Sequence, residues 1–413
     1  MDSAESKASD CRITKVVARH LQMRLPHPYA IASGVMYHAD TVVIEIIATD
    51  KILGKEVYVG YGEGAPHRSF SEKELVPDIL HYIESTAGPQ MLQKDPVALL
   101  LLDKFTTNPD PDHIVALGAI DIALWDLYGK ITGKPICDLL GRVREGGDVL
   151  WPVSSANSLQ DDIKALKEKV DKGFHSFMIK CGSHPDVQTD IDRVLGLLQH
   201  KFVHPIELIP DANQGWNLED ATKFVQAIIK AKENSNLPNR VAFLEQPLHR
   251  NSQVQNMLEL QKEAHRQLFF SADESIRTLE DLHTICENKH FQVGSIKVCK
   301  VGGITGAMQA CHILADGGIR LYFNSMIEGS CAQAALLHVY CATREAVLTD
   351  LGHAFMSVLR LEEYADFYKC LSTDKSKVRV ALEKPGLGLQ MNVAKMDEQT
   401  RQKIQLVAEP IHF

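Results

Sequence analysis

The 413-residue chain lacks several features that would place it in a specialised class of protein. No apolar run approaches the roughly 18 residues needed for a membrane-spanning helix, and none of the nine cysteines forms a Cys-x-x-Cys pair. The formal net charge is −9, which disfavours nucleic acid and anionic membranes as partners. With 45% hydrophobic and 23% charged residues, the composition is that of an ordinary globular protein.

The cysteines and the first residues both favour a cytoplasmic location. Several cysteines lie inside apolar runs, such as Cys311 in QACHILA and Cys341 in VYCAT, which is typical of buried free thiols in a reducing compartment. Residues 1–11 are polar and of mixed charge, lack the apolar core of a secretory signal and contain acids that disfavour a transit peptide. We expect residues 1–11 to be disordered.

The length predicts two domains, since single cores rarely grow beyond about 250–300 residues. Residues 12–65 are rich in β-branched side chains interrupted by glycines, which indicates strands. Residues 73–140 place apolar side chains at helical spacing, and the strongest stretch ends in a Gly-Lys-Pro stop signal. We therefore predict an α+β capping domain over residues 1–145.

After Gly141 short apolar runs alternate with helix-like stretches. Seven such runs occur between VLWPVSSAN and IRLYFNSMIEGS, and each ends in polar or glycine residues. This alternation predicts a parallel sheet, and the polar ends favour an α/β fold of the modified TIM-barrel type, (β/α)7–8, over an open doubly wound sheet. We place the barrel at residues 146–375, with a candidate eighth strand at 350–361. We expect residues 376–413 to return to the capping domain.

Six polar residues in the second half each follow an apolar run, at intervals of 24 to 34 residues. That interval is about one strand–helix–strand unit, and in a parallel barrel the strand ends converge on one face. The pattern therefore predicts that these six side chains, among them three successive carboxylates and two lysines, gather around one point. The six residues are Lys180, Asp211, Glu245, Asp273, Lys297 and Glu328.

The carboxylates at this point suit a hard cation. A single carboxylate after a strand is as readily an N-cap of the next helix, but three in succession are harder to explain as caps. Oxygen ligands without His or Cys favour Mg²⁺, or alternatively Mn²⁺, over zinc. Lys180 and Lys297 have apolar flanks, and a buried lysine near other cations has a lowered pKa suited to a general base. Lys300 is the weaker candidate, because strand alternation would point it to the opposite face.

Five motifs of the chain resemble those of the mandelate racemase/muconate lactonizing enzyme family, which is part of the enolase superfamily. The likeness is to its muconate lactonizing enzyme-like branch. The motifs are LGAIDIALWDLYGKITGKPICDLLGR before the barrel and PDANQGW, LEQP, SADES and IKVCKVGGI within it. The resemblance implies one Mg²⁺ held by Asp211, Glu245 and Asp273. It also implies that Lys180 and Lys297 lie on opposite faces of a small carboxylate substrate, and that the protein is a homo-oligomer.

At the expected substrate contacts the sequence departs from the family pattern. The family often has Lys-x-Lys at the end of the second barrel strand, whereas this chain has Met178 in place of the first lysine. Asn213 follows Asp211 by two residues, so on an extended strand it would face the same side, although it is equally a turn-former. Histidines such as His67 show no ligand spacing and are interpreted as surface or packing residues. The substrate-binding candidates are Tyr29, Ser33, Met178, Asn213 and Glu328.

The resemblance implies Mg²⁺-dependent removal of the proton α to a carboxylate through an enediolate. We expect a racemase or epimerase of an amino-acid derivative, of proline type or a dipeptide, because two opposed lysines suit proton transfer at one carbon. A lyase of the cis-3-hydroxyproline dehydratase type and a muconate-like cycloisomerase remain open, since they would use the same residues. A non-catalytic barrel scaffold is a third alternative, supported only by Met178.

Overall fold

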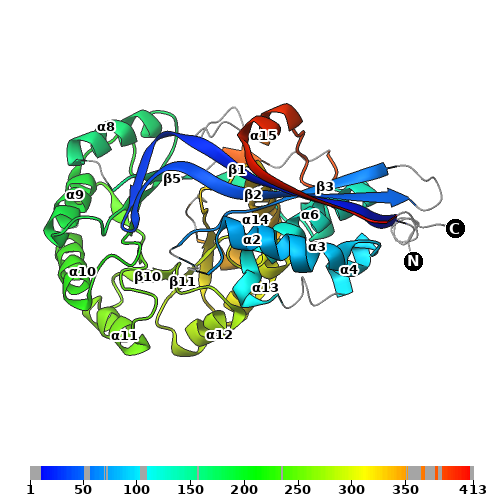
Figure 1. The fold of residues 1–413 in the computed structure, drawn as a ribbon. Helices are drawn as coiled ribbons and strands as arrows, with labels where there is room; N and C mark the ends of the chain where they lie inside the picture. Colours follow the sequence, from blue (N-terminus) through cyan, green and yellow to red (C-terminus); the bar gives the residue numbers. More distant parts are fainter. Residues whose placement is uncertain are drawn as a thin grey trace.

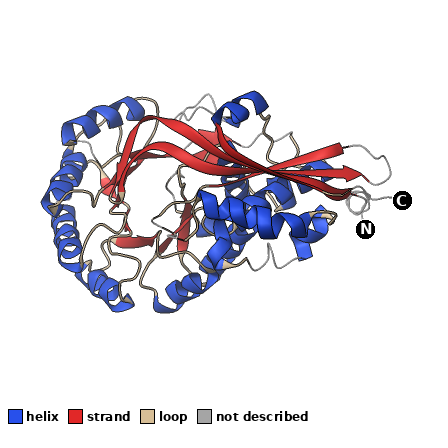
Figure 2. Cartoon of the chain, viewed as in Figure 1, coloured by secondary structure: helices blue, strands red, loops and turns tan. Residues whose placement is uncertain are grey.

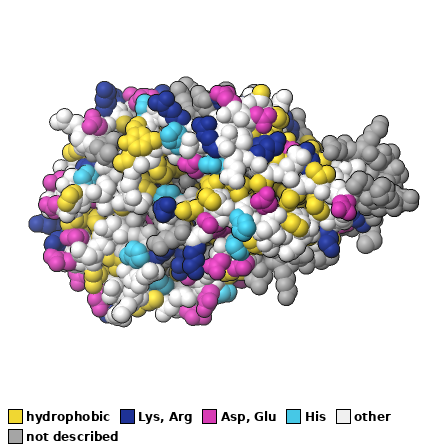
Figure 3. Space-filling model, in the orientation of Figure 1, with side chains coloured by type: hydrophobic (Ala, Val, Ile, Leu, Met, Phe, Trp, Pro, Cys, Tyr) yellow, Lys and Arg dark blue, Asp and Glu magenta, His cyan; other side chains and the backbone are white. Residues whose placement is uncertain are grey.

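The computed structural model describes residues 11–50, 56–68, 70, 73–102, 109–155, 158–233, 236–349, 351, 364–367, 377–379 and 384–409. Residues 1–10, for which disorder was expected, lie outside these ranges, while Cys11 begins the first strand. No helix within the described ranges is long and apolar enough to cross a membrane. The eight cysteines in these ranges are free, and seven are buried. On the face shown in Figure 3, acidic, basic and hydrophobic side chains are intermingled.

The N-terminal region forms an antiparallel sheet in the order β14-β1-β2-β3. The two long strands β1 and β2 pair along most of their length, as their β-branched sequences predict. The C-terminal strand β14 pairs with β1, with Val17 opposite Gln405, so the tail returns to this sheet (Figure 1). The strands are β1 (Cys11–Ile31), β2 (Gly34–Asp50), β3 (Glu56–Gly64) and β14 (Thr400–Val407).

Helices cover one side of this sheet, and the longest lies directly on β3. That helix, α6 (Ile114–Thr132), approaches so closely that a Cβ at Gly62 would lie 2.0 Å from the Ala119 carbonyl oxygen. A Cβ at Gly60 would lie 2.2 Å from the Ala123 carbonyl oxygen. Alternate glycines on β3 thus meet successive turns of α6, backbone against backbone. The shorter helices are α2 (Val76–Tyr82), η1 (Ile83–Ala87), α3 (Gly88–Met91), α4 (Pro96–Leu102), η2 (Pro111–His113) and α7 (Ile136–Leu139).

The seven apolar runs of the second half form one parallel sheet in the order β12-β11-β10-β9-β7-β6-β5, with β8 beside β7. This confirms the predicted modified barrel with an N-terminal α+β domain. The domain boundaries themselves stay a prediction. The strands are β5 (Leu150–Val153), β6 (Ser176–Lys180), β7 (Glu207–Asp211), β8 (Arg240–Val241), β9 (Phe243–Glu245), β10 (Phe269–Ala272), β11 (Val293–Ile296) and β12 (Arg320–Phe323).

Helices follow the barrel strands and form an outer layer around them (Figure 2). Most of these helices are amphipathic, so that one face packs on the sheet and the other meets solvent. The last of them, Ser330–Ala342, is the exception, since all of its residues are buried. Ser158 and Thr278 accept hydrogen bonds at the starts of two of them and complete capping boxes. The helices are α8 (Leu159–Val170), α9 (Val187–Gln199), α10 (Leu218–Lys232), α11 (Val254–Glu263), α12 (Leu279–Asn288), α13 (Gly303–Asp316) and α14 (Ser330–Ala342).

Inside the barrel, one apolar side chain from each of several strands forms a common layer. It consists of Leu150, Met178, Ile209, Phe243, Val293, Tyr322 and Leu351. Leu351 belongs to the segment predicted as an eighth strand. Nearby, Leu348 forms an isolated parallel bridge with Leu321 of β12. Residues 350 and 352–363 lie outside the described part of the chain, so the eighth strand stays a prediction.

A buried carboxylate joins the capping sheet to the barrel. Glu63 of β3 accepts hydrogen bonds from the backbone N–H of Gly329, at 2.8 Å, and of Ala332, at 3.2 Å. These groups lie at the start of α14, where the first N–H groups of a helix have no partner within the helix. The Tyr364 hydroxyl also donates to Glu63, at 2.7 Å. This contact fixes β3 against the barrel.

The contact between β3 and α6 predicts a large effect of adding one methyl group. In Gly62→Ala the new Cβ has no room, because its nearest neighbours are backbone atoms that cannot rotate away. We expect the free energy of unfolding to fall by about 3 kcal/mol, measured by denaturant unfolding.

Gly141→Ala is the matched control. Gly141 has φ +86°, but no atom lies within 4 Å of an added Cβ. We expect this variant to lose only about 1 kcal/mol, from the left-handed backbone. Equal losses in the two variants would contradict the close contact between β3 and α6.

Candidate active site

The polar residues singled out by their spacing converge at the carboxyl ends of the barrel strands. Lys180, Asp211 and Glu245 are the last residues of β6, β7 and β9. They also lie side by side, because Lys180 pairs with Asp211 in the sheet register and Asp211 pairs with Glu245. Asp273 follows β10 directly, and Lys297 follows β11 directly. All five side chains are buried.

Each of two carboxylates in this row is ion-paired with lysine. Lys180 Nζ donates to Asp211 Oδ2. Lys297 Nζ lies 2.7 Å from Asp273 Oδ2, and Lys300 Nζ lies 2.6 Å from Asp273 Oδ1. Burial works against the ionisation of Asp273, but the two ammonium groups outweigh it and hold the pKa of this carboxyl below its usual range.

The position of Lys300 differs from the prediction. Strand alternation was expected to point it to the opposite face from Lys297. However, β11 ends at Ile296, and residues 298–302 form a turn, so the two-residue period no longer applies. The Lys300 N–H donates to the Lys297 carbonyl at 3.0 Å. This turn brings the Lys300 side chain back onto Asp273, where it is buried.

Glu245 is bound by neutral donors instead of lysine. The Tyr322 hydroxyl donates to Glu245 Oε2, and Asn324 Nδ2 donates to Oε1 at 3.2 Å. Burial raises the pKa of Glu245 well above its ordinary value, and the nearby charges of Asp211 and Asp273 raise it further. Tyr322 and Asn324 were not predicted as site residues, because the apolar run that contains them gave no sign of which side chains face inward.

The three carboxylates match the chemistry of a hard-cation site in their residue types but not in their present arrangement. Within the described ranges, no group of three His, Cys, Asp or Glu side chains is arranged so that it could bind a metal ion. The carboxylate oxygens of Asp211, Glu245 and Asp273 accept hydrogen bonds from the donors described above. The set does contain only oxygen ligands, which suits Mg²⁺. Burial is the main cause of the raised pKa of Glu245, and the neighbouring charges of Asp211 and Asp273 add to it.

The pKa values of the lysines run opposite to the prediction of a lowered value. Burial alone would lower the pKa of Lys180, but Asp211, Tyr29 and Glu245 raise it above its ordinary value. Lys297 behaves alike: burial lowers its pKa, while Asp273 and other carboxylates give a net increase. The prediction assumed that a bound cation would offset the carboxylate charge, whereas here the carboxylates act on the lysines directly.

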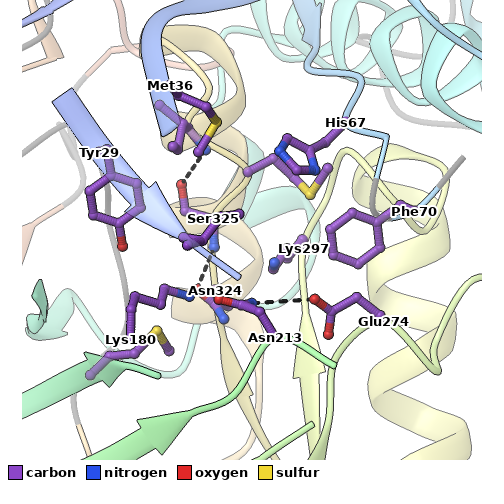
Figure 4. Close-up of a pocket in the computed structure, with 14 residues that line it drawn as sticks. Tyr29, Met36, His67, Phe70, Lys180, Asn213, Glu274, Lys297, Asn324 and Ser325 are labelled. Atoms are coloured by element: carbon purple, nitrogen blue, oxygen red, sulfur yellow. Dashed lines mark hydrogen bonds between the residues drawn. The ribbon is translucent and has the colours of Figure 1, made fainter. Parts of the chain in front are cut away.

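A small pocket lies above these groups, with a volume of about 40 Å³. Lys180 and Lys297 enter it from separate strands, with Tyr29 near the first and Phe70 near the second (Figure 4). Asp211, Glu245 and Asp273 are not among its lining residues. The lining residues are Tyr29, Ile31, Met36, His67, Phe70, Met178, Lys180, Asn213, Glu274, Lys297, Asn324, Ser325, Met326 and Ile327.

Asn213 reaches this pocket through a turn and not along an extended strand. Strand β7 ends at Asp211, and Asn213 has φ 43°, in the left-handed region. Its Nδ2 donates to Glu274 Oε1 at 3.3 Å (Figure 4). Glu274, which was not predicted as a site residue although it directly follows Asp273, also lines the pocket. Burial, with repulsion from Asp273 and Asp211, raises the pKa of Glu274 to about 8.

Two of the five substrate-binding candidates do not line the pocket. Ser33 lies at the rim of a neighbouring hollow. Glu328 is buried below the pocket wall, where it accepts hydrogen bonds from the Met326 N–H and from Gln333 Nε2. Between Met326 and Glu328, Ile327 has φ 68°, which is unfavourable for a β-branched residue. The Glu328 carboxylate therefore holds a strained segment of the wall.

The tip of the β1–β2 hairpin covers the pocket and carries Tyr29. The Ala30 carbonyl accepts hydrogen bonds from the Ser155 N–H at 3.1 Å and from Ser155 Oγ at 3.0 Å, and the Ala30 N–H donates to Ser154 Oγ at 3.2 Å. Both serines follow β5, so the tip is attached to the barrel. Burial raises the pKa of Tyr29 to about 12, and its hydroxyl has no hydrogen-bond partner among the described residues.

His67 and Phe70 complete the pocket from the segment after β3. His67, which was interpreted as a surface or packing residue, lines the pocket, and only the fold brings it there. Burial lowers the pKa of His67 to about 4, with Lys297 and Lys180 adding to the effect, so the imidazole is neutral at pH 7. The Phe70 ring centroid lies 4.6 Å from Lys297 Nζ and 5.2 Å from Lys300 Nζ, a cation–π geometry.

The attachment of the hairpin predicts how the pocket opens. In a Ser154→Ala/Ser155→Ala variant the side-chain hydrogen bonds to Ala30 are lost, while the backbone bond from Ser155 remains. We expect the amides of residues 29–36 to exchange with solvent about tenfold faster, as lost hydrogen bonds of about 1 kcal/mol imply. Hydrogen–deuterium exchange with mass spectrometry measures this.

Ser158→Ala is the control, because Ser158 caps α8 through Asp161 and, among the described residues, forms no hydrogen bond with the hairpin. It should leave the exchange of residues 29–36 unchanged. If the double variant also leaves that exchange unchanged, the two serines do not hold the tip.

Two family models together match most of the chain. Residues 161–395 match the model described as enolase C-terminal domain-like, and residues 13–141 match the N-terminal domain of mandelate racemase/muconate lactonizing enzyme. These matches correspond to the barrel region and to the capping sheet with its helices.

Several characterised proteins are similar over nearly the full length. An L-Ala-D/L-Glu epimerase of Clostridium acetobutylicum is 27% identical, over 92% of this chain and 98% of the relative. An N-succinyl-L-Arg/Lys racemase of Bacillus cereus is 25% identical, over 94% and 98%. Muconate cycloisomerase 1 of Pseudomonas putida is 26% identical, over 85% and 88%.

Solved structures of similar enzymes superimpose on this chain. The crystal structure of the Bacillus cereus N-succinyl Arg/Lys racemase superimposes with a TM-score of 0.81, at 22% identity over 96% of this chain and 100% of that one. A dipeptide epimerase of Enterococcus faecalis, solved with Mg and L-Leu-L-Tyr, gives 0.77 at 25% identity, over 92% and 99%.

Proposed function

This chain belongs to the mandelate racemase/muconate lactonizing enzyme family of the enolase superfamily, and on that premise we propose that it is a racemase or epimerase acting next to the carboxylate of an amino-acid derivative. The relatives include a dipeptide epimerase and an N-acyl amino acid racemase, which supports dipeptides or N-acyl amino acids as substrates. A proline-type substrate stays a prediction.

One observation carries the proposal: Lys180 and Lys297 enter one small pocket from separate strands. Moving a proton from one face of a carbon to the other requires one group that accepts it and a second that returns a proton from the opposite side. In one direction the neutral amine of Lys180 takes the α-proton and becomes an ammonium group, while the ammonium group of Lys297 donates a proton to the opposite face of the same carbon and becomes a neutral amine. The reverse reaction exchanges their roles, and solvent restores both lysines. A cation held by Asp211 would offset the carboxylate charge that raises the pKa of Lys180.

The remaining groups orient the substrate and exclude water. Tyr29 on the attached hairpin has a buried hydroxyl aimed at the same region as Lys180, so it can donate to a substrate oxygen. Asn213 and Asn324 line the floor with amide groups. Asp211, Glu245 and Asp273 would hold a Mg²⁺ ion, which when bound stabilises the negative charge that builds up on the substrate carboxylate.

A cycloisomerase is the second candidate, because muconate cycloisomerase is similar over most of its length. Such a reaction needs one proton-transferring lysine and a second anionic or unsaturated group in the substrate. Met178 is an apolar lining residue at the position where the family often has a lysine. A lyase would use the same lysines, so the products must separate these reactions.

The two-lysine proposal predicts a one-sided loss of proton exchange. In D₂O, the Mg²⁺-loaded protein should incorporate deuterium at Cα of both enantiomers of a substrate drawn from pools of dipeptides, N-acyl amino acids and proline derivatives. Lys297→Ala should slow the inversion of the substrate about a thousandfold and should still exchange the α-proton of one enantiomer only. Lys180→Ala should exchange the α-proton of the other enantiomer. Mass spectrometry detects the label, and chiral chromatography detects the inversion.

Several outcomes count against this proposal. Loss of water or ring closure would identify the lyase or the cycloisomerase. Full activity of Lys297→Ala on both enantiomers would rule out the pair of lysines. A protein that binds Mg²⁺ but exchanges no proton in any pool would point to the non-catalytic scaffold.

The proposed cation site predicts that Glu245→Gln and Glu328→Gln differ in their affinity for Mg²⁺. Glu245→Gln should weaken Mg²⁺ binding by at least about tenfold, because it removes one of three negative ligands. Glu328→Gln alters a carboxyl group that is equally buried but turned towards the loop at Met326, so it should leave the affinity unchanged. Isothermal titration calorimetry measures both, and equal affinities would remove Glu245 from the ligand set.

The expectations about assembly, location and partners stay predictions. The resemblance implies a homo-oligomer, the cysteine pattern favours the cytoplasm, and the net charge disfavours nucleic acid and membranes. Sedimentation of the purified protein would determine the number of subunits.

A further inference from the structure

A buried arginine lies behind Lys180, outside the lining of the pocket. Arg193 belongs to α9, the helix that follows β6, and only 3% of its surface is exposed. A buried guanidinium group is costly unless its charge is paired. Arg193 Nε and Nη2 both donate to Oδ2 of the buried Asp162 of α8, at 3.0 and 2.8 Å. This ion pair connects the neighbouring helices α8 and α9 (Figure 1).

Arg193 also donates to two backbone carbonyl groups. Nη1 donates to the Lys180 carbonyl at 3.1 Å, and Nη2 donates to the Ser154 carbonyl at 3.3 Å. The pairing of β5 with β6 ends at Val153 and Ile179, so these two carbonyl groups belong to the first residues beyond the ladder, where a buried carbonyl needs another partner. One guanidinium group therefore joins the chain after β5 to the last residue of β6.

A second residue of α9 fixes the turn that follows Lys180. Asp190 lies one helical turn before Arg193, and its Oδ2 accepts a hydrogen bond from the Gly182 N–H at 2.8 Å. Gly182 has φ +78°, and a Cβ there would lie 2.2 Å from the Ala212 carbonyl oxygen. The backbone from Lys180 to Gly182 is therefore held by α9 on one side and meets the chain after β7 on the other.

The contacts of Arg193 continue to the hairpin that covers the pocket. Ser154, whose carbonyl accepts from Arg193, accepts a hydrogen bond from the Ala30 N–H through its side chain, at 3.2 Å. Ala30 follows Tyr29 at the hairpin tip. A continuous series of hydrogen bonds thus runs from the tip through Ser154 and Arg193 to the backbone of Lys180.

Lys297 is supported in another way. Its carbonyl accepts the Lys300 N–H within the turn after β11, and among the described residues no side chain is hydrogen-bonded to its backbone. Its ammonium group lies 2.7 Å from Asp273 and 4.6 Å from the centroid of the Phe70 ring. Arg193 therefore connects the hairpin to Lys180, whereas Lys297 is held by Asp273 and Phe70.

We propose that Arg193 is a positioning residue for Lys180, and that it transmits the closed position of the β1–β2 hairpin to this lysine and not to Lys297. The assignment rests on the proposed racemase or epimerase function, in which each lysine takes the proton of one enantiomer. Arg193 touches no substrate, but it fixes the backbone from which the Lys180 side chain extends. A displacement of about 1 Å at a catalytic group can cost about a hundredfold in rate, so a loosened backbone slows proton removal by Lys180.

Arg193→Lys tests this assignment and keeps a positive charge beside Asp162. A single ammonium group cannot replace the planar fork that binds Asp162 and both carbonyls together. The Mg²⁺-loaded, full-length protein is incubated in D₂O with each enantiomer, and deuterium is measured in the recovered starting enantiomer. We expect exchange of the enantiomer that Lys180 deprotonates to slow about tenfold, and exchange of the other to stay within about twofold. Lys297→Ala, which exchanges only the first enantiomer, identifies which is which.

Arg144→Lys is the matched control. Arg144 also donates to a backbone carbonyl, that of Tyr340 at 2.8 Å, and pairs with Glu345 at 2.6 Å, but none of these residues lines the pocket. It should leave the ratio of the two exchange rates unchanged. Equal slowing of both enantiomers in Arg193→Lys would indicate a merely structural role and overturn the proposal. Unchanged exchange of both enantiomers would overturn it as well.

Ser154→Ala is a second variant, which removes the side-chain bond to Ala30 but no charge, and so remains informative if Arg193→Lys does not fold. It should slow exchange of the same enantiomer, by less than Arg193→Lys does. When the two changes are combined, the total slowing should be smaller than the product of the separate effects, because both interrupt one series of hydrogen bonds. Fully independent effects would contradict transmission from the hairpin.

A further readout requires no turnover and separates this assignment from the proposed function. Arg193→Lys should raise the hydrogen–deuterium exchange of the amides of residues 29–36 severalfold, since it weakens the attachment of Ser154, whereas Arg144→Lys should not. Unchanged amide exchange would overturn the connection, even with active protein. If the unaltered protein exchanges no α-proton in any substrate pool, the proposed function fails, and the amide exchange still decides whether Arg193 holds the hairpin.

Discussion

The balance of charge at the carboxyl ends of the barrel strands is the constraint on which the site depends. Buried carboxylates are tolerated only when paired or bound to a cation, and here lysines are bound to Asp211 and Asp273, whereas Glu245 is bound only by neutral donors. The same pairing fixes the lysine nitrogens at the mouth of the pocket. The groups suited to move protons are thus positioned by the carboxylates below them.

Much of this arrangement could be predicted from the sequence, because a parallel barrel converts regular spacing into proximity. Lys180, Asp211 and Glu245 could be placed together since each ends a strand, and strand ends share one face. Where the chain leaves the strand, the two-residue period stops. Lys300 therefore returned to Asp273 against the prediction, and His67 and Phe70 could not be found, because only the tertiary fold brings their segment over the pocket.

The site divides its tasks between the two parts of the fold. The strand ends supply the buried lysines and carboxylates, on rigid elements. The β1–β2 hairpin and the segment after β3 supply Tyr29, His67 and Phe70, which line the pocket above the strand ends. Such loops can change without altering the chemistry, which agrees with a family whose members include epimerases, a racemase and cycloisomerases.

The glycines of β3 add a mechanical consequence. Because Gly60 and Gly62 bring the β3 backbone against that of α6, no compressible side chain lies between them, and the strand cannot settle closer or tilt. Strand β2 is hydrogen-bonded to β3 and continues into the hairpin. The base of the hairpin is therefore a fixed pivot, and any movement on ligand entry or release must arise at its far end, beyond the irregularity between Arg24 and Tyr29, against the hydrogen bonds of Ala30 with Ser154 and Ser155.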